Sequence, residues 1–342
     1  MNTPVDPIEG GAALLDAEDE EVFVFPLSFA QQRLWFVDRM EPGNPFYNVP
    51  AALRLEGPLD ADALARSLGE IVFRHETLRT VFAVEDEEPV QVVLPWRPFD
   101  LPREDLSGLP PGERGAELER RVAEDARRPF DLATGPLFRA ALLRLSEEEH
   151  VLLLAMHHVV SDGWSMGILL RELTAAYAAF AAGEEPRLPE MPIQYADFAV
   201  WQREHLSGER LEAQLAYWRG ELAGVPVLEL PTDRPRPAVP TYRGRSVDFA
   251  VPVGVAAALR ELAREEEATL FMPLLAAFQA LLSRYAGQDD VVVGTAIANR
   301  NRSEIEGLIG FFVNTLALRA DLSGDPSFRE LLRQVRERTF GA

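Results

Sequence analysis

The sequence predicts a mixed α/β protein, an α+β sandwich arranged in two lobes. Stretches with apolar residues at helical spacing alternate along the chain with short apolar or β-branched runs of strand length. The 342 residues exceed the common size of one domain, and 47% of them are hydrophobic, which is enough to fill two cores. Prolines crowd residues 183–242, where they fix φ and remove backbone donors, as suits a connector. We therefore expect an N-terminal lobe over residues 22–182, and the connector with a second lobe over residues 183–342.

The elements of the first lobe follow from local patterns. Residues 1–21 are polar and acidic and are expected to form a linker or flexible tail. Ser28 and Gln31 have the spacing of a capping box, which predicts a helix that runs to Met40. Apolar periodicity predicts the other elements. Helices are expected at 59–78 and 118–128, and strands at 47–55, 81–84, 90–94, 137–145 and 151–156.

The second half of the chain begins with two expected helices, at about 195–205 and 211–222. Asp325 and Pro326 are the residue types of an N-cap and a first helical position, which predicts that the last helix starts there. Between these points the apolar pattern alternates between helix and strand. Strands are expected at 245–251, 290–298 and 312–318, and helices at 255–267 and 273–285.

Composition excludes several classes of chemistry. The net charge of −21 argues against nucleic-acid binding, which needs a basic surface. The chain has no cysteine, so it offers neither a disulfide nor a thiol nucleophile. All 34 basic residues are arginine, and without lysine a Schiff-base mechanism is excluded. Local arginine clusters can still meet an acidic partner; these are Arg234 with Arg236, Arg243 with Arg245, and Arg300 with Arg302.

The hydropathy of the chain does not indicate a membrane protein. No run approaches the roughly 18 consecutive apolar residues of a membrane span. The N-terminus is acidic rather than basic and then apolar, so no secretory signal is seen. We expect the protein to be cytoplasmic.

The stretch from Val151 to Ser165 concentrates the residues that can carry chemistry. Its apolar start has the length of a buried strand, and two histidines follow. Because successive strand side chains point to opposite faces, only one of His157 and His158 can face a cavity if the strand continues that far. Asp162 or the serine before it would cap the next helix, and Gly163 permits a tight turn or the close approach of a ligand. The helix N-terminus would favour an oxyanion.

Two other interpretations of these residues remain open at this point. A histidine at a strand end is commonly a hydrogen-bonded core residue with no role in chemistry. A metal site formed by His157, His158 and Asp162 is the second alternative, since imidazole and carboxylate groups bind zinc. The divergence of the two histidines on a strand, and the lack of another ligand cluster among only five histidines, argue against it.

The segment MHHVVSDGWS (156–165) resembles the HHxxxDG signature of condensation domains from nonribosomal peptide synthetases, which are relatives of chloramphenicol acetyltransferase. Four further segments resemble motifs of that family and follow in the family's order. The resemblance covers nearly the whole chain from Val22 onward. The four segments are SFAQQRLWF (28–36), RHETLRTVF (74–82), YADFAVWQ (195–202) and IGFFVNTLALR (309–319).

The resemblance implies two chloramphenicol-acetyltransferase-like lobes in a V. Family members continue beyond this length, so we expect a C-terminally truncated chain whose second lobe is incomplete, with an exposed sheet edge and apolar surface. The implied reaction is amide-bond formation between an upstream aminoacyl or peptidyl thioester and a downstream aminoacyl thioester. The implied partners are upstream and downstream peptidyl carrier domains, whose 4'-phosphopantetheine arms enter a tunnel from opposite mouths, and an adjacent adenylation domain. No bound cofactor or metal is implied, and truncation can leave the chain inactive.

The resemblance also assigns roles to individual residues. His158 is expected to act on the attacking amine, as a general base or as a positioning group, with His157 beside it. Asp162 is expected to stay ionised in an ion pair with an arginine, for which Arg74 is the first choice and Arg79 the second. The Gly163 amide is a candidate donor to the oxyanion. The expected substrate contacts are Trp164, Ser165, Asn314, which would meet the pantetheine arm or fix its loop, and Arg79.

Three rival functions are possible for a domain with this fold or with these partners. An epimerization domain would share the histidine motif, although the segments at 74–82 and 309–319 fit condensation better. A heterocyclization domain normally replaces the histidine pair with aspartate chemistry. A non-catalytic module that recruits carrier proteins or enzymes is the third rival, and the intact His158, Asp162 and Gly163 argue against it. The residues of these motifs resemble those of the subtype that takes L-configured donors.

Overall fold

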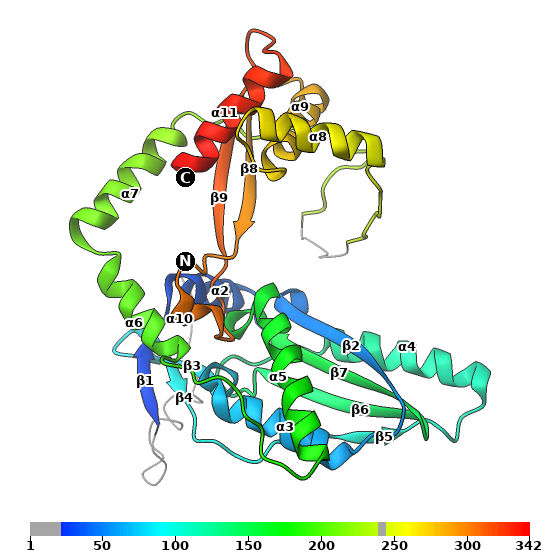
Figure 1. Cartoon of the computed structure of the whole chain (residues 1–342). Coiled ribbons are helices and arrows are strands. Elements are labelled where there is room, and N and C mark those ends of the chain that lie inside the picture. Colours follow the sequence, from blue (N-terminus) through cyan, green and yellow to red (C-terminus); the bar gives the residue numbers. More distant parts are fainter. Residues whose placement is uncertain (1–21, 239–243) are drawn as a thin grey trace. The chain divides into compact units, whose positions relative to one another are not determined.

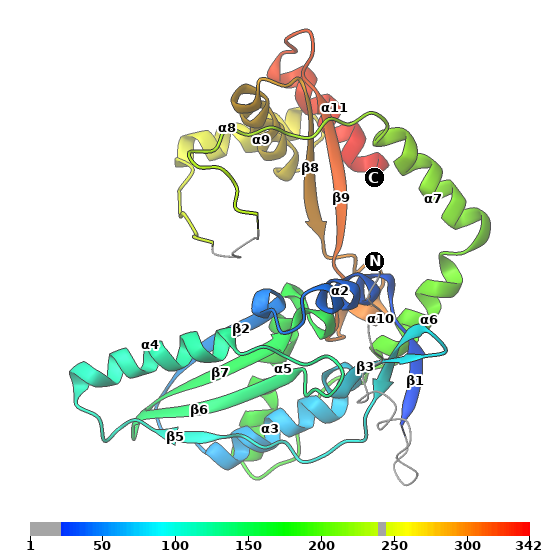
Figure 2. The ribbon, with the colours of Figure 1, turned by 180° about the vertical axis from the view of Figure 1, so that it is seen from behind.

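The structure is a computed structural model that describes residues 22–238 and 244–342 (Figures 1 and 2). The tail expected over residues 1–21, and Arg243 of the arginine clusters, lie outside the described residues. The described chain divides into two compact units. The first unit extends to Leu206 and also contains Ala298–Val313, and the second consists of Ser207–Ile297 and Asn314–Ala342.

This division differs from the expected boundary after residue 182. Helix α6 (Tyr195–His205) belongs to the first unit because its buried Tyr195 and Phe198 pack in one cluster with Phe312. The proline-rich connector therefore starts later than its composition indicates. The segment 298–313 was expected in the second lobe, and it belongs to the first unit because its own apolar side chains enter that unit's cores.

A four-stranded sheet in the order β2-β7-β6-β5 forms the centre of the first unit. Strand β7 (Glu149–His157) pairs antiparallel with β2 (Asn48–Glu56) on one side and with β6 (Phe138–Ser146) on the other. The short β5 (Arg103–Asp105) joins β6 in parallel. The three long strands lie within a few residues of their expected positions, whereas β5 has no apolar pattern that would have predicted it.

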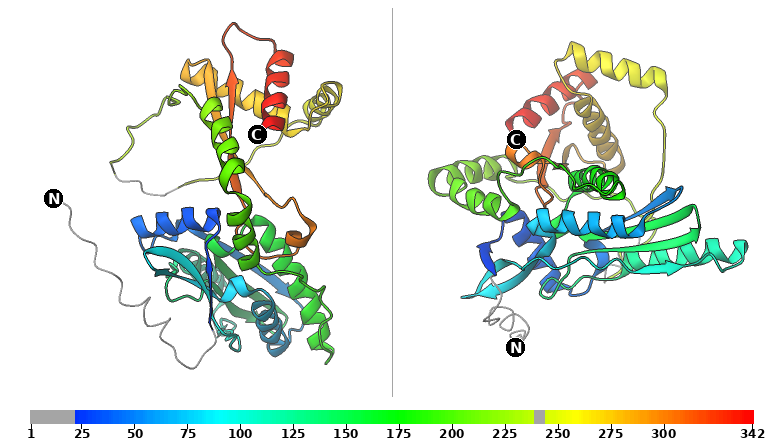
Figure 3. Two further views of the ribbon diagram at one scale, coloured as in Figure 1. Left: turned by 90° about the vertical axis from the view of Figure 1, so that its left-hand side faces the viewer. Right: turned by 60° about the horizontal axis from the view of Figure 1, so that its bottom comes forward.

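Helices cover both faces of this sheet (Figure 3). Helices α3 (Ala61–Arg74) and α5 (Gly163–Ala181) pack against one face, where they share a core with Leu152, Leu154 and Met156 of β7. Alternate residues of the same strand, among them Leu153, face the opposite side and pack near α4 (Pro111–Arg127). The strand is apolar at every position from Val151 to Met156 because both of its faces are covered there.

A smaller sheet and helix α2 complete the first unit. The sheet has the order β1-β4-β3, with β1 at Phe23–Pro26, β4 at Glu88–Val93 and β3 at Thr80–Glu85. The capping box of α2 (Phe29–Met40) is confirmed, because Ser28 accepts from the Gln31 amide and the Gln31 side chain accepts from the Ser28 amide. Short 3₁₀ turns follow α2, α3 and β7: η1 (Pro45–Tyr47), η2 (Glu76–Arg79) and η3 (His158–Val160).

The segment 298–313 is an insert from the second half of the sequence into the first unit, and it carries the short helix α10 (Ser303–Glu306). Ile309 joins the core between α3 and α5, and Phe311 joins the core beneath α2. Phe312 packs against α6. These buried side chains bring the insert beside the turn that follows β7.

The second unit contains one antiparallel pair of strands, β8 (Asp290–Ile297) and β9 (Asn314–Asp321). Within the described residues each of these strands has one unpaired edge. Helices α9 (Phe271–Ala286) and α11 (Phe328–Gly341) form a core with β9. Two further helices of this unit are α7 (Gly208–Glu221) and α8 (Val253–Glu265).

Two sequence predictions for the second unit are wrong. Residues 245–251 form no strand, and Val247 and Phe249 are 80% and 87% exposed, because no described strand pairs with them. The cap of α11 is Ser327, which accepts from the Glu330 amide, whereas Asp325 adopts a positive φ of 55° before the helix.

Helix α9 exposes an apolar stripe at helical spacing, formed by Phe271, Leu274, Phe278, Leu281 and Tyr285. Across the described ranges, every helix is too short or too polar to cross a membrane.

Candidate active site

His157 is the last residue of β7, and its ring is a buried part of the core. Its Nδ1 accepts a hydrogen bond from the Val159 amide at 3.1 Å, and the rings of Tyr47 and Phe130 meet it edge-on. Burial, with a smaller contribution from the neighbouring His158, lowers the pKa of His157 from 6.5 to about 4. The ring is therefore neutral at physiological pH, carries its proton on Nε2 and serves the structure of the turn.

His158 starts the η3 turn and is only partly buried. Its Nδ1 lies 2.6 Å from the Ser161 carbonyl oxygen. A carbonyl oxygen can only accept, so Nδ1 carries a proton, and in the neutral ring Nε2 presents the lone pair. The ring of Phe311 packs against the imidazole with 4.7 Å between centroids. The two histidines thus hold opposite tautomers and have separate tasks, because the strand ends between them.

Asp162 is the N-cap of α5 and forms a buried ion pair with Arg300 of the insert. The Arg300 Nη2 atom lies 3.1 Å and 3.3 Å from the two carboxylate oxygens, and each side chain is 1% exposed. The same carboxylate accepts from the Ser165 amide and from the Phe312 amide. One side chain therefore joins the turn after β7, the start of α5 and the insert.

Arg300 is held by more than its carboxylate partner. Its Nη1 donates to the carbonyl oxygens of Ile305 at 2.6 Å and Leu308 at 2.7 Å, and its guanidinium lies 4.0 Å from the centre of the Phe312 ring. Burial lowers the pKa of Arg300, and the Asp162 charge opposes this shift. Because an arginine remains charged at neutral pH, the two charges neutralise each other inside the fold.

The expected partners of Asp162 are corrected by these contacts. Arg74 pairs with Glu172 through its Nε atom at 3.4 Å and donates to the Pro189 carbonyl oxygen at 2.7 Å. Arg79 donates to the Leu94 carbonyl oxygen and to Glu76. Both guanidinium groups are occupied by neighbours. Neither arginine of the 74–82 motif is therefore the partner of Asp162, which is instead an arginine that the insert brings from 138 residues away.

Ser165 and Gly163 flank the capped start of α5 in different ways. The Ser165 side chain is fully buried, and its hydroxyl lies within hydrogen-bond distance of Asp162 at 2.7 Å and of the Gly310 carbonyl oxygen at 3.0 Å. This contradicts the expected contact of Ser165 with substrate. Gly163 is exposed at the first helical position, with no atom within 4 Å of where a Cβ would lie. Its openness leaves room for a ligand near the first amides of the helix.

Trp164 and Asn314 are both exposed and both have a polar group in the side chain, but they belong to different units. The Trp164 ring is half exposed, and its Nε1 donates to the Glu306 carbonyl oxygen at 3.0 Å. Asn314 begins β9 in the second unit, where its side-chain oxygen accepts from the Thr315 amide at 2.9 Å. Their expected substrate contacts stay predictions.

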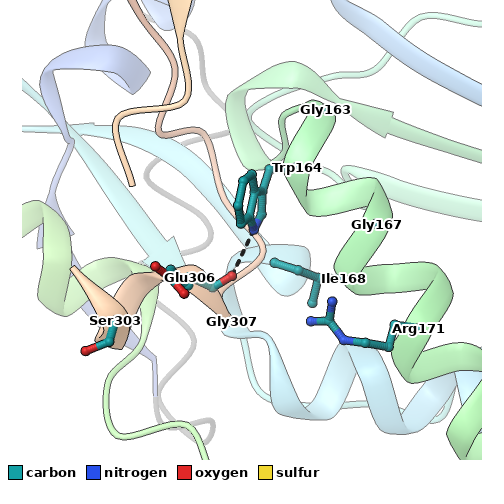
Figure 4. A pocket seen from close by; sticks show the side chains of 8 residues that line it. All are labelled: Gly163, Trp164, Gly167, Ile168, Arg171, Ser303, Glu306 and Gly307. Atoms are coloured by element: carbon teal, nitrogen blue, oxygen red, sulfur yellow. Dashed lines mark hydrogen bonds between the residues drawn. The ribbon is translucent and has the colours of Figure 1, made fainter. Parts of the chain in front are cut away.

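A hollow of about 560 Å³ lies between α5 and the insert, within the first unit (Figure 4). Trp164 and Arg171 of α5 form one wall, and the chain at Glu306 and Gly307 forms the other. His158 does not line this hollow. The described residues contain no cluster of three or more histidine, cysteine, aspartate or glutamate side chains arranged to hold a metal ion.

The model of the family described as "Condensation domain" matches residues 23–342. The chain belongs to the condensation-domain family. It is 54% identical over 318 residues to one of the linear gramicidin synthase proteins of Brevibacillus parabrevis, and the match covers 93% of this chain and 4% of that protein. It is 50% identical over 313 residues to phosphinothricin tripeptide synthetase PhsC of Streptomyces viridochromogenes, and that match covers 91% of this chain and 29% of the synthetase. The chain thus spans a small part of these relatives.

Solved structures share its fold. The X-domain from teicoplanin biosynthesis superposes with a TM-score of 0.84 at 33% identity, over 92% of this chain and 70% of that one. The first condensation domain of the CDA synthetase superposes with a TM-score of 0.73 at 25% identity, over 93% of this chain and 76% of that one. The expected family and the expected mixed α/β fold class, similar to chloramphenicol acetyltransferase, are confirmed.

The Asp162–Arg300 pair predicts strong coupling in a double-mutant cycle. Asp162→Asn and Arg300→Met should each lower the free energy of unfolding by about 3–5 kcal/mol, because each leaves the other group buried without its partner. The double variant should lose little more than either single variant. Denaturant unfolding measures these energies. Arg74→Met is the matched control, and its effect should add to that of Asp162→Asn; coupling of Asp162 to Arg74 in place of Arg300 would contradict the assignment.

The lowered pKa of His157 predicts acid destabilisation. Unfolded histidine titrates near 6.5 and folded His157 near 4, so the unfolded state binds more protons between these values and stability falls as the pH decreases through this window. Between about pH 7 and pH 5 the loss should be about 2 kcal/mol. Unfolding of the wild type and of His157→Gln at both pH values isolates this contribution. Equal pH dependence in the two proteins would show that His157 is not buried in its neutral form.

Proposed function

We propose that this condensation domain catalyses amide-bond formation between two thioesters on carrier proteins. The donor is an aminoacyl or peptidyl group on an upstream carrier, and the acceptor is an aminoacyl group on a downstream carrier. The observation that carries the proposal is the His158 imidazole, whose Nδ1 is committed to the Ser161 carbonyl oxygen and whose Nε2 is left with a lone pair. That is the state needed to accept a proton or a hydrogen bond from an attacking amine.

The proposed reaction uses His158 to direct the amine. The amine nitrogen of the acceptor attacks the donor carbonyl carbon while one of its N–H bonds points to Nε2 of His158. The C–N bond forms, the C–S bond breaks, and the amine proton leaves with the donor thiol. His158 acts as a general base or as the group that orients the nucleophile, and positioning alone can supply several kcal/mol of the barrier reduction.

Asp162 has a structural role in this proposal. Its carboxylate is buried, and Arg300 and the amides of Ser165 and Phe312 occupy its oxygens, so it does not face the reacting groups. It holds the turn that places His158. The Gly163 amide lies in the first turn of a 19-residue helix, where backbone donors lack helical partners and the dipole favours negative charge. We assign it as a donor to the oxyanion of the tetrahedral intermediate.

The partners in this proposal supply the thiol groups of both thioesters. The chain has no cysteine, so the thiols of both thioesters must arrive on other groups, for which we propose the 4'-phosphopantetheine arms of upstream and downstream peptidyl carrier domains. An adjacent adenylation domain would load them. The exposed Asn314 and Trp164 stay candidates for contact with these arms.

A second candidate function is a non-catalytic recruiting module. It is favoured by one comparison: the X-domain that superposes with a TM-score of 0.84 at 32% identity is described in a complex with OxyB from teicoplanin biosynthesis, and the match covers 100% of this chain and 72% of that one. A recruiting module needs a binding surface but no basic imidazole. The two functions therefore differ in what His158 contributes.

Substitution of His158 separates the two functions. With donor-loaded and acceptor-loaded carriers, His158→Ala should lower the rate of product formation by about 10²–10⁴-fold, because it removes the group that acts on the amine. Thermal melting of the variant should change little, since the ring is only partly buried. Product formation at the wild-type rate would refute the catalytic assignment. Carrier binding without any turnover by the wild type would favour the recruiting module.

A further inference from the structure

The hydroxyl of Tyr195 is a buried polar group that the proposed reaction does not use. Tyr195 opens helix α6 and is 1% exposed. Its oxygen lies 2.6 Å from the Phe311 carbonyl oxygen and 2.8 Å from the Ser28 hydroxyl. The carbonyl oxygen can only accept, so the tyrosine donates to Phe311 and accepts from Ser28. Ser28, the cap of α2, therefore donates to Tyr195, and Tyr195 donates to the backbone of the insert.

The insert is also pressed against the Tyr195 ring. A Cβ added to Gly310 would lie 2.1 Å from Cδ2 of that ring, so only glycine permits this approach. The Phe312 ring meets Tyr195 edge-on, with 4.9 Å between centroids. The Gly310 backbone and the Phe312 ring, on either side of Phe311, thus pack against Tyr195, and the tyrosine hydroxyl binds the Phe311 carbonyl group between them.

Phe311 in turn contacts the imidazole of His158. Their ring centroids are 4.7 Å apart with 59° between planes. The Ser161 carbonyl oxygen holds Nδ1 of the imidazole, and the Phe311 ring packs against the imidazole itself. Tyr195 is therefore two contacts away from the ring of His158, through the main chain and side chain of a single residue.

The aromatic motif around Tyr195 is explained by core packing only in part. A phenylalanine would fill the same space, and a buried hydroxyl costs free energy unless both of its hydrogen-bonding functions are satisfied. Here both are satisfied, and burial raises the pKa of the phenol, so the group remains a donor at physiological pH. The hydroxyl adds a directional constraint that ring packing does not supply.

We propose that Tyr195 is a positioning residue, whose hydroxyl fixes the Phe311 carbonyl group and thereby sets the Phe311 ring against His158. The proposal rests on the catalytic role of His158. Loss of the hydroxyl lets the Phe311 main chain shift, and the imidazole loses the ring that restrains it. A variant without the hydroxyl should therefore orient the attacking amine less well, while its binding of the carriers should not change.

The kinetics of three variants test the proposed relay, which is the chain of contacts from Tyr195 through Phe311 to His158. Tyr195→Phe should lower kcat about tenfold and leave KM for both carriers within about twofold, because a small misplacement of a reacting group lowers the rate of the chemical step. Phe311→Leu should give the same pattern, and the double variant should be no slower than either single variant. Ser28→Ala is the matched control: it removes the other hydrogen bond of Tyr195 and the cap of α2, so it should lower the melting temperature without changing kcat.

A structural readout separates failure of this inference from failure of the proposed function. In the wild-type chain, nuclear Overhauser contacts should connect the Phe311 and His158 rings, and Tyr195→Phe should weaken them. Unchanged ring contacts together with unchanged kcat in Tyr195→Phe would overturn the relay while leaving His158 catalytic. Additive losses of kcat in the double variant would also overturn it. If Tyr195→Phe does not fold, full activity of Phe311→Leu overturns the relay by itself. Wild-type turnover by His158→Ala would instead refute the function, and the ring contacts would still report on the positioning.

Discussion

The buried ion pair between Asp162 and Arg300 is the constraint on which the site depends. It joins residues 138 positions apart and neutralises two charges that are each 1% exposed. Removing ions from water is costly, so the pair persists only because the carboxylate and the guanidinium also satisfy backbone groups on both sides. The bond from the Phe312 amide to Asp162, together with the buried Ile309 and Phe311 side chains, holds the insert at 298–313 in the first unit. The backbone bonds of the pair also fix the turn between β7 and α5, and with it the place of His158.

Around this pair the chain gives adjacent histidines opposite electrostatic roles. His157 is taken into the core at the last strand position, where burial keeps it neutral. His158 begins the next turn, where a backbone carbonyl oxygen holds Nδ1, so the neutral ring has its lone pair on Nε2. Asp162 transfers no proton in this scheme, because Arg300 and two backbone amides occupy its buried carboxylate. In the proposed reaction, His158 acts on the amine, and its neighbours determine the position of its ring.

Local sequence patterns predicted the parts of this structure that depend on near neighbours. The Ser28 capping box, the apolar β7 strand and a helix cap at Ser161 or Asp162 were each predicted from residues a few positions apart. Each is present, and the cap is Asp162. The partner of Asp162 could not be found in this way, because Arg300 reaches it only after the insert returns to the first unit. Its signal in the sequence was weak: an arginine cluster in an acidic chain, which fits a solvated surface equally well. For the same reason Ser165 was mistaken for a substrate contact, since periodicity does not show which groups the insert covers.

The most direct test of the account is the tautomer of His158, measured by ¹⁵N NMR on histidine-labelled chain at mildly alkaline pH. The geometry predicts a protonated Nδ1 and an unprotonated Nε2, with the His158→Ala variant identifying the signals. His157 provides an internal reference, because its Nδ1 accepts from the Val159 amide and its proton must lie on Nε2. Opposite patterns for the two rings would support the central claim that the turn delivers one basic nitrogen. A His158 ring protonated on Nε2 would contradict it, because no lone pair would then face an attacking amine.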